Sequence, residues 1–519
     1  MQRPNRRATP LIAALAALLP ALAPAARAAD VPGLAGRRPN IILVLSDDQG
    51  YGDLGRNGNA VIKTPSLDRM YDEAVRFEDF HVSPTCSPTR CSIMAGRHEF
   101  RSGVTHTIHE RERMSLKATT IVQLLKGAGY ATGIFGKWHL GDEAEYQPGR
   151  RGFDEVFIHG AGGIGQSYPG SCGDAPKNSY FDPVVLHNGT FVKTQGYCTD
   201  VFFAQARKWI EAKKGGGAPF FCYITPNAPH GPLHVPEKYE RMYDGLLPTA
   251  DGGNGGPAGK KGAAGQGRGK DVAKFFGMIT NIDENVGALL AKLKELDIER
   301  DTLVIYINDN GGTAGCSVWN AGMKGTKGTA SNGGTRAMSL WRWPGTLAPA
   351  SVDALTAHLD LFPTFAELAG AKVPEAVASK LEGFSLLPLL RDPKAPGHDD
   401  RMLVTHVGRW NPGAAPEKLG RCSIRWRQYL YFPSGKGGTL YDLKADPGET
   451  KDIAPEKADV AGRLAKAYDA WWEATLPCLE NEEAYKTAPK INPFRDLYWK
   501  QFKGPGPNDA PPPEGMTFP

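Results

Sequence analysis

Short apolar runs of strand type alternate along the chain with segments of helical periodicity. The clearest strand candidates are the continuous runs Asn40–Ser46, Ala131–Phe135, Phe220–Thr225 and Leu303–Asn308. Apolar residues recur at helical spacing over Thr120–Lys126 and again over Ala273–Leu296. Continuous apolar runs are typical of parallel strands that are buried on both faces. The alternation therefore predicts an α/β fold built on a mostly parallel sheet.

Polar residues come at or shortly after the end of each predicted strand. In chain order these residues are Asp47-Asp48, Lys137-Trp138-His139, Pro226–His230 and Asp309-Asn310-Gly311. The carboxyl ends of parallel strands meet at one edge of a sheet, and ligands of open α/β sheets bind in the crevice outside that edge. We therefore expect all of these polar clusters to face one crevice.

Several of these side chains are oxygen ligands for a metal ion. Asp47, Asp48 and Asp309 bring three negative charges, and Asn310 adds an amide oxygen. Hard oxygen donors of this kind suit Ca²⁺ or Mg²⁺, whereas zinc sites are rich in thiolate or imidazole. The sequence thus predicts a site for Ca²⁺ or Mg²⁺.

The same clusters hold cations and groups that transfer protons, namely Lys137, His139, His230 and the downstream Lys327. This is the set of groups that would surround a tetrahedral oxyanion ester. Taken singly, such residues are most often turn, cap or surface groups. The prediction of a catalytic site depends on their joint occurrence at strand ends.

Composition excludes several classes of protein. The 519-residue chain is 41% hydrophobic and 23% charged, which is ordinary for a folded protein and excludes wholesale disorder. Its net charge is +5, but four arginines in the first 28 residues account for most of it and leave +1 for the rest. A nucleic-acid partner is therefore not expected.

The N-terminus has the pattern of a secretory signal peptide over residues 1–28. Three arginines precede the Ala/Leu-rich segment Leu11–Leu22, and Ala26–Ala28 is a cleavage site of the A-x-A type. The apolar segment is shorter than a membrane-spanning helix, and no later segment qualifies. We expect a secreted or periplasmic protein without a membrane span.

Export suggests that some of the eight cysteines form disulfides. Cys172 and Cys198 bracket a stretch rich in Gly, Pro and Asn and are candidates for a pair. One of the remaining cysteines, Cys86, belongs to a motif with another purpose.

The segment Cys86-Ser87-Pro88-Thr89-Arg90 matches C-x-P-x-R, and Gly96-Arg97 follows it. This motif resembles the signal by which type I sulfatases, members of the alkaline phosphatase superfamily, have a cysteine oxidised to formylglycine. Pro88 and the following residues can open a helix, which would place position 86 at a positive helix end.

Other segments are similar to landmarks of the same family, and the resemblance extends from Pro39 to Ala454. They are Pro39–Gly55, Gly136–Gly141, Ala228–His230, Asp309–Gly311, Lys327–Gly334 and Leu440–Glu449. Two positions depart from the family pattern. Asn332 stands where glutamate is usual, and Ala95 where threonine or leucine is usual. The first departure concerns a hydrogen bond around Lys327, and the second concerns recognition by the maturation enzyme.

The resemblance implies a large mixed, mostly parallel sheet flanked by helices, with a smaller C-terminal α+β domain on an antiparallel sheet. We place the catalytic domain at residues 37–395 and the smaller domain at 396–503. The Gly-rich stretch 251–270 is predicted to be a flexible insertion, and the Pro-rich stretch 504–519 a mobile tail.

The resemblance also implies a nucleophile and its metal. A formylglycine-generating maturation enzyme would oxidise Cys86, and the hydrated aldehyde would present two hydroxyl groups. One would bind the metal together with Asp47, Asp48, Asp309 and Asn310, and the other would attack sulfur.

The remaining roles follow from the same resemblance. Asp309 would be the base for the attack, and Arg90 would fix the diol. Lys137 and Lys327 would neutralise the sulfate oxygens. His230, aided by Lys327, would protonate the leaving oxygen, and His139 would take a proton from the second hydroxyl so that sulfate is expelled.

The sequence therefore predicts a sulfatase that hydrolyses a sulfate monoester of a carbohydrate or an aryl alcohol. One alternative is a phosphodiesterase or phosphonate monoester hydrolase of the same superfamily. Another is a catalytically silent glycan-binding protein. Loops at strand ends carry specificity. We expect 160–196, 251–270 and 408–420 to shape the rim of the site.

Overall fold

The computed structural model describes residues 33–246, 265–396 and 399–502. The predicted signal peptide and the predicted C-terminal tail lie outside the described residues. So do residues 251–264 of the predicted insertion, while 265–270 are helical.

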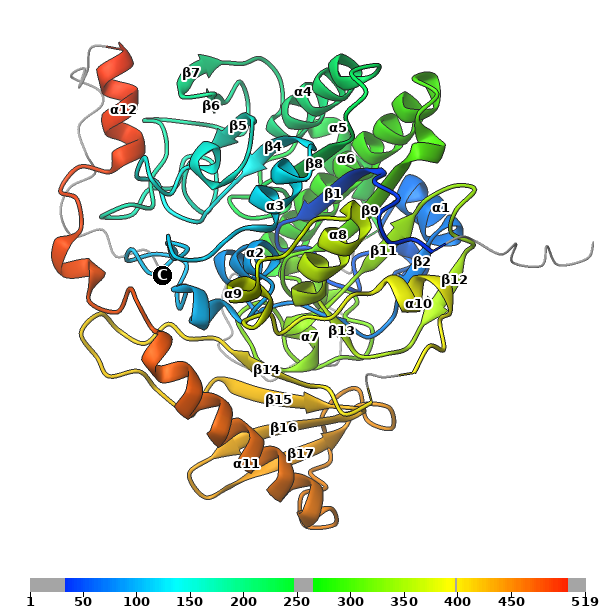
Figure 1. Cartoon of the computed structure of the whole chain (residues 1–519), viewed down its shortest axis with the longest axis vertical. Helices are drawn as coiled ribbons and strands as arrows, with labels where there is room; N and C mark the ends of the chain where they lie inside the picture. Colours follow the sequence, from blue (N-terminus) through cyan, green and yellow to red (C-terminus); the bar gives the residue numbers. More distant parts are fainter. Residues whose placement is uncertain (1–32, 247–264, 397–398, 503–519) are drawn as a thin grey trace, which may run out of the picture. The chain divides into compact units, whose positions relative to one another are not determined.

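A ten-stranded sheet organises the larger part of the described chain (Figure 1). Its strands in spatial order are β12 (Ala350–Val352), β2 (Val75–Phe77), β11 (Ser339–Arg342), β9 (Thr302–Asn308), β1 (Asn40–Ser46), β8 (Phe220–Thr225), β4 (Ala131–Lys137), β5 (Glu155–His159), β6 (Val184–His187) and β7 (Thr190–Lys193). The five central strands from β9 to β5 are parallel, and β11, β6 and β7 pair antiparallel with their neighbours. The predicted mixed, mostly parallel sheet is confirmed.

Helices cover both faces of this sheet. The helices of this part are α1 (Pro65–Glu73), α2 (Cys86–Ala95), α3 (Ile121–Gly127), α4 (Cys198–Lys213), α5 (Glu237–Glu240), α6 (Gly265–Glu295), α7 (Asn332–Thr335), α8 (Leu361–Ala369), α9 (Glu375–Ala378) and α10 (Leu387–Arg391). Three of them differ from the prediction at their first residue, and the smallest difference is in α3, which begins at Ile121 and not at Thr120. Helix α6 begins eight residues before Ala273, and α2 begins at Cys86 itself.

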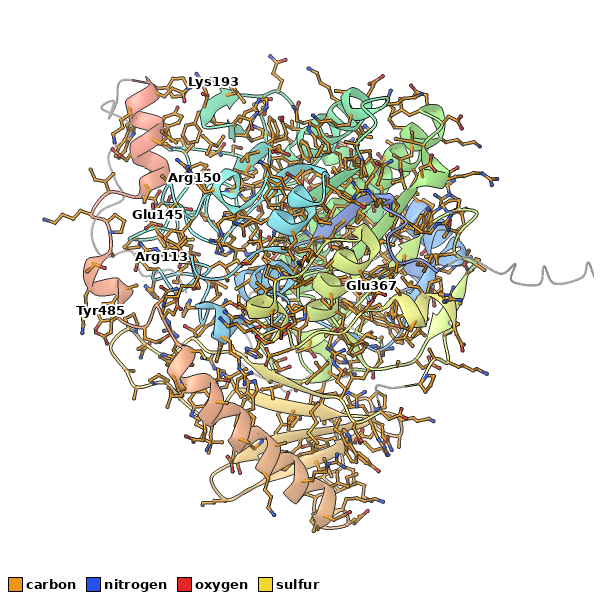
Figure 2. The ribbon with its side chains drawn as sticks, in the orientation of Figure 1. Arg113, Glu145, Arg150, Lys193, Glu367 and Tyr485 are labelled. Atoms are coloured by element: carbon orange, nitrogen blue, oxygen red, sulfur yellow. The ribbon has the colours of Figure 1, made fainter. Side chains whose placement is uncertain are left out.

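Strand β8 shows why the apolar runs are continuous. Phe220, Cys222 and Ile224 belong to a buried cluster that includes residues of α4 and α6. Between them, Phe221 points to the other face, where its ring lies 5.9 Å from that of Phe365 in α8. Because successive side chains of a strand point to opposite faces, a strand covered on both sides needs an apolar residue at every position. Figure 2 shows side chains filling the space between sheet and helices.

The C-terminal part has a sheet of its own. Its four strands are antiparallel, in the order β14 (Met402–His406), β15 (Cys422–Trp426), β16 (Tyr429–Ser434) and β17 (Gly437–Asp442). Helix α11 (Ala458–Thr475) packs on it through Leu464 and Tyr468, and α12 (Pro493–Phe502) follows. A three-stranded sheet of β10 (Arg336–Ala337), β3 (Phe80–His81) and β13 (Thr356–Ala357) completes the strands. The small antiparallel C-terminal sheet is confirmed, whereas the domain boundaries stay a prediction.

The expectation of disulfides is wrong for this structure, in which all eight cysteines are free. Cys172 and Cys198, the suggested pair, occupy separate sites. The Cys172 sulfur lies 3.7 Å from Nε2 of His139, and Cys198 opens α4 inside the buried cluster. Sequence spacing alone could not reveal this, because pairing depends on the approach of the two Cβ atoms.

No helix among residues 33–246, 265–396 and 399–502 combines the length and the apolarity that crossing a bilayer requires.

Gly136 provides a test of how the sheet positions Lys137. Its φ is +122°, and an added Cβ would lie 2.1 Å from the carbonyl oxygen of Thr225 on β8. We expect Gly136→Ala to lower the free energy of unfolding by more than about 3 kcal/mol, because strain and a backbone clash combine. The midpoint of thermal unfolding measures this. Gly189→Ala is the matched control, since Gly189 also has positive φ but has open space around it. Equal, small effects of the two substitutions would contradict the argument.

Candidate active site

Neighbouring strands bring the predicted polar residues to one edge of the sheet. Strands β9, β1, β8 and β4 lie side by side and are parallel, so their carboxyl ends share that edge. Backbone hydrogen bonds continue beyond the strands. Asp309 N–H donates to the Ser46 carbonyl over 3.0 Å, and Asp47 N–H donates to the Ala228 carbonyl over 3.1 Å.

Each of the three predicted metal-binding carboxylates is paired with a cation. The shortest nitrogen–oxygen distances are 2.5 Å for Lys137–Asp47, 2.6 Å for Lys327–Asp48 and 2.9 Å for Arg90–Asp309. The first and third pairs are almost wholly buried, and the second is slightly open to solvent. Buried charges are costly unless they are paired in this way.

The donor set fits a hard divalent cation. Oxygen atoms of Asp47, Asp48 and Asp309 lie within 4.8 Å of one another. Oδ1 of Asp47 and Oδ1 of Asn310 are buried and have no hydrogen-bond partner among the described residues. The amide nitrogen of Asn310 donates to Asp48 over 3.0 Å, which fixes the amide. Unpartnered buried oxygens beside clustered carboxylates are the pattern that a Ca²⁺ or Mg²⁺ ion would satisfy.

The carboxylates repel one another, and their pKa values show it. Burial and the neighbouring Asp47 raise the pKa of Asp309 to about 7, although Arg90 opposes this. Burial also acts to raise the pKa of Asp48, but Lys327 outweighs it and lowers that pKa well below its usual range. Asp48 therefore stays ionised, and the crowding of like charge favours a bound cation.

Cys86 is the first residue of α2 and is almost fully buried. Its sulfur, an Asp47 oxygen and a His230 nitrogen lie within 4.8 Å of one another. Arg90 follows one turn later, and its guanidinium donates to Asp309 and, over 2.9 Å, to the Lys137 carbonyl. The helix places Cys86 at its positive end and Arg90 against the carboxylates, since residues four apart lie on one face.

Two histidines present a bare nitrogen to the site. His139 Nε2 lies 2.8 Å from the Thr107 carbonyl, so this nitrogen carries the proton and leaves Nδ1, which is buried without a partner. His230 Nδ1 lies 2.6 Å from the Gly231 carbonyl, and its Nε2 lies 3.8 Å from Asp48. Burial, followed by Lys327, lowers the pKa of His230 to about 3. Burial and Lys137 lower the pKa of His139 as well. Both imidazoles are neutral at pH 7.

Two residues of the site have a left-handed backbone. Asp48 has φ +71° and His139 has φ +59°. Such values are uncommon outside glycine and persist only where the surrounding contacts impose them. Here they turn the chain two residues beyond the end of β1 and two residues beyond the end of β4.

The departure at Asn332 does not disturb Lys327, whose ammonium group is bound to Asp48. The backbone N–H of Asn332 instead donates to Glu449 over 2.8 Å. Ala95 ends α2 and is buried. Nothing in the structure explains what its replacement of a larger residue would do to maturation.

Sequence reasoning missed the residues that support the histidines from the loops. Thr107 binds His139, and Gln166 donates to the Gly231 carbonyl over 3.2 Å beside His230. The loop 160–196, predicted to form the rim, supplies Gln166. Thr107 belongs to no motif. It contacts His139 through its backbone carbonyl, so the identity of its side chain could not predict this contact.

Comparison with known proteins agrees with this geometry. The family model described as Sulfatase matches residues 39–371. The chain belongs to the sulfatase family, whose members hydrolyse sulfate esters. A second model, described as the C-terminal part of N-sulphoglucosamine sulphohydrolase, matches residues 332–470. The enzyme class predicted from the motifs is confirmed.

Curated proteins that are similar to this chain include arylsulfatases. Mouse arylsulfatase G is 30% identical over 80% of this chain and 80% of its own. Human arylsulfatase A is 29% identical over 81% of this chain and 84% of its own. N-acetylgalactosamine-6-sulfatase from pig is 31% identical over 68% of this chain and 66% of its own.

Two solved structures illustrate the similarity in fold. The crystal structure of Ps i-CgsB in complex with k-i-k-neocarrahexaose has a TM-score of 0.72 at 26% identity, and covers 90% of this chain and 99% of its own. The phosphonate monoester hydrolase of Agrobacterium radiobacter has a TM-score of 0.59 at 20% identity, and covers 86% and 97%. At that identity the second likeness concerns the fold alone.

Substituting Asp309 tests the carboxylate cluster as a metal site. Asp309→Asn removes one of three negative charges, so we expect the affinity of metal-stripped protein for Ca²⁺ to fall by about tenfold or more. Calorimetric titration measures it. Asp53→Asn is the control, because Asp53 is buried and lies beyond the end of β1, as Asp47 and Asp48 do, but is outside the cluster. Activity lost on chelation should return with Ca²⁺ or Mg²⁺. Unchanged Ca²⁺ affinity in Asp309→Asn would exclude the site.

Proposed function

We propose that this protein hydrolyses a sulfate monoester through a formylglycine made from Cys86, with Ca²⁺, or alternatively Mg²⁺, bound nearby. The observation that carries the proposal is the position of Cys86. The cysteine of the C-x-P-x-R motif lies at a helix N-terminus, within 4.8 Å of an Asp47 oxygen and a His230 nitrogen. No ordinary thiol chemistry calls for a neighbouring set of oxygen donors for a hard cation.

The metal would be held by Asp47, Asp48, Asp309 and Asn310 together with the modified residue 86. When bound, it would supply positive charge that stabilises the sulfate oxygens. The hydrated aldehyde at position 86 would supply one hydroxyl for attack on sulfur and a second from which sulfate is eliminated. An aldehyde is needed because its hydrate has this second hydroxyl. The sulfate ester of an ordinary serine has no second oxygen on the same carbon, so sulfate could not be eliminated from it.

The chain's own cations bind and orient the sulfate group. Lys137 and Lys327 each already face a carboxylate of the metal cluster, and they neutralise the negative charge on the sulfate oxygens. Arg90 holds both Asp309 and the Lys137 carbonyl, so it fixes the base against the nucleophile. Asp309 accepts the proton of the attacking hydroxyl.

The two histidines divide the remaining proton transfers. His230 passes to the departing oxygen a proton that its Nε2, which is bare in the free protein, first takes from the ammonium group of Lys327. His139 takes one from the remaining hydroxyl through its bare Nδ1, while the Thr107 carbonyl holds the other nitrogen in its protonated form. Each histidine is oriented by a backbone carbonyl, which fixes the tautomer.

A carbohydrate sulfate is the substrate class that the relatives favour. N-acetylgalactosamine-6-sulfatase is among them at 31% identity, and Ps i-CgsB binds a neocarrahexaose at 26% identity. We also propose that the chain is exported to the periplasm or outside the cell, on the strength of its N-terminal pattern, and that a formylglycine-generating enzyme matures it.

The alternative function is hydrolysis of a phosphate diester or a phosphonate monoester, since the chain has a fold similar to that of a phosphonate monoester hydrolase. Values of kcat/KM on matched aryl sulfates, phosphate diesters and phosphonate monoesters decide between them. We expect the sulfate to be preferred. Preference for phosphorus would select the rival.

The peptide that contains Cys86 provides the direct test of maturation. We expect its mass to be about 18 Da below that of the cysteine form, because CH₂SH becomes CHO. Cys86→Ala should abolish turnover without loss of folding, and Cys86→Ser should be nearly inactive in a host that oxidises only cysteine. Cys91→Ala is the control, since Cys91 lies on the same helix. An unmodified, inactive wild type would identify a silent binding protein.

A series of sulfates with graded leaving-group pKa tests the role of His230. Protonation matters for a sugar alkoxide and little for a nitrophenolate, so His230→Ala should lose about 10²- to 10⁴-fold in kcat/KM on poor leaving groups only. Lys137→Ala is the comparison, because it removes charge from the sulfate itself and should depress all substrates alike. If His230→Ala gives a uniform loss, Lys327 becomes the candidate acid.

A further inference from the structure

Arg409 lies in the loop that follows β14, and this loop is fastened against the loop that contains Thr107. Gly408 has φ +65°, and an added Cβ would lie 2.2 Å from the Thr105 carbonyl oxygen, so the two backbones are in direct contact. The N–H of Arg409 donates to that same carbonyl over 3.1 Å. Arg421 donates to the Gly408 carbonyl over 3.0 Å. The backbone of Arg409, with φ +64°, is thereby held in place.

The side chain of Arg409 reaches the residue that supports His139. Its guanidinium donates to the Thr107 hydroxyl over 3.0 Å, while the Thr107 carbonyl binds His139 Nε2 over 2.8 Å. Thr107 therefore connects Arg409 to His139. Burial lowers the pKa of Arg409.

The guanidinium of Arg409 differs from those of Arg90 and Arg111 in its partners. Among the described residues no carboxylate lies within ion-pair distance of Arg409, and its Nε is buried without a hydrogen-bond partner. Arg90 and Arg111, by contrast, have Asp309 and Glu482 as partners. Leaving a buried donor of a charged group unsatisfied costs free energy that an incoming anion would recover.

A neighbour of Arg409 adds a hydrogen-bond donor. The rings of His106 and His109 lie 5.2 Å apart. His106 Nδ1 accepts the backbone N–H groups of Thr107 and Ile108, so Nε2 carries the proton and is a donor. Burial and then Arg409 and Arg111 push the pKa of His106 far below its ordinary value. The cluster therefore offers hydrogen-bond donors and positive charge.

We propose that Arg409, with His106 as a second donor, binds another anionic group of the substrate, a carboxylate or a further sulfate on the sugar beside the scissile ester. The assignment rests on the proposed sulfatase function and deepens it, because it names the class of substrate. A sugar that carries only the scissile sulfate would leave Arg409 unpaired, whereas a uronic acid or a disulfated sugar would satisfy it.

The test compares sugars that differ in one group. The wild type hydrolyses 4-nitrophenyl sulfate in the presence of competing sugars, and the inhibition constant of each sugar is measured. The sugars are matched and carry a hydroxyl, a carboxylate or a sulfate at the same position. We expect the wild type to prefer an anionic sugar over its neutral counterpart by about tenfold or more, the range of a charge-assisted hydrogen bond. Arg409→Met should remove that preference, and Arg409→Lys should restore part of it. Whether carboxylate or sulfate is preferred identifies the group.

A control and two outcomes complete the test. Lys418→Met removes a cation from the same loop whose partners are Asp469 and Glu473 on α11, so it should leave both preference and turnover unchanged. The inference is overturned if the wild type prefers no anionic sugar. It is also overturned if Arg409→Met lowers kcat/KM for 4-nitrophenyl sulfate as much as it weakens the anionic sugars, which is what a purely structural role through Thr107 predicts. Failure of the wild type to hydrolyse any sulfate would instead reject the proposed function.

Discussion

Three carboxylates brought close together out of water are the constraint on which the site depends. The cost of burying Asp47, Asp48 and Asp309 is offset because each faces its own cation. The paired set is neutral, so a divalent ion bound among its free oxygens would leave the pocket with a surplus of two positive charges. A bound metal would therefore make the pocket more attractive to an anion, which would couple metal binding to substrate binding.

The sheet is what makes this crowding possible. Asp48 and Asp309 are far apart in sequence, yet the N–H of Asp48 donates to the Asp309 carboxylate over 3.1 Å because β1 and β9 are adjacent and parallel. Strands anchored on both faces by α4, α6 and α8 cannot move apart to relieve the repulsion. Strain is retained in the left-handed backbone of Asp48 and His139.

Much of this could be predicted from the sequence, and the failures have physical reasons. Strands β1 and β8 were predicted to the residue, because a continuous apolar run bounded by polar residues leaves little freedom in its ends. The disulfides were wrong, since buried cysteines also pack singly. The contact between Arg409 and Thr107 joins two loops about 300 residues apart and has no local signal.

The two halves of the site are held in different ways, and this bears on how specificity can change. The carboxylates and their cations are locked to strand ends and to α2, so a substitution there leaves a buried charge unpaired. Arg409 is held by backbone hydrogen bonds of two loops, and its guanidinium has no ion-pair partner among the described residues. Exchanging its side chain would therefore leave the charge balance of the metal cluster intact. If Arg409 binds substrate as proposed, substrate choice could change at this loop while the paired charges at the sheet stay as they are.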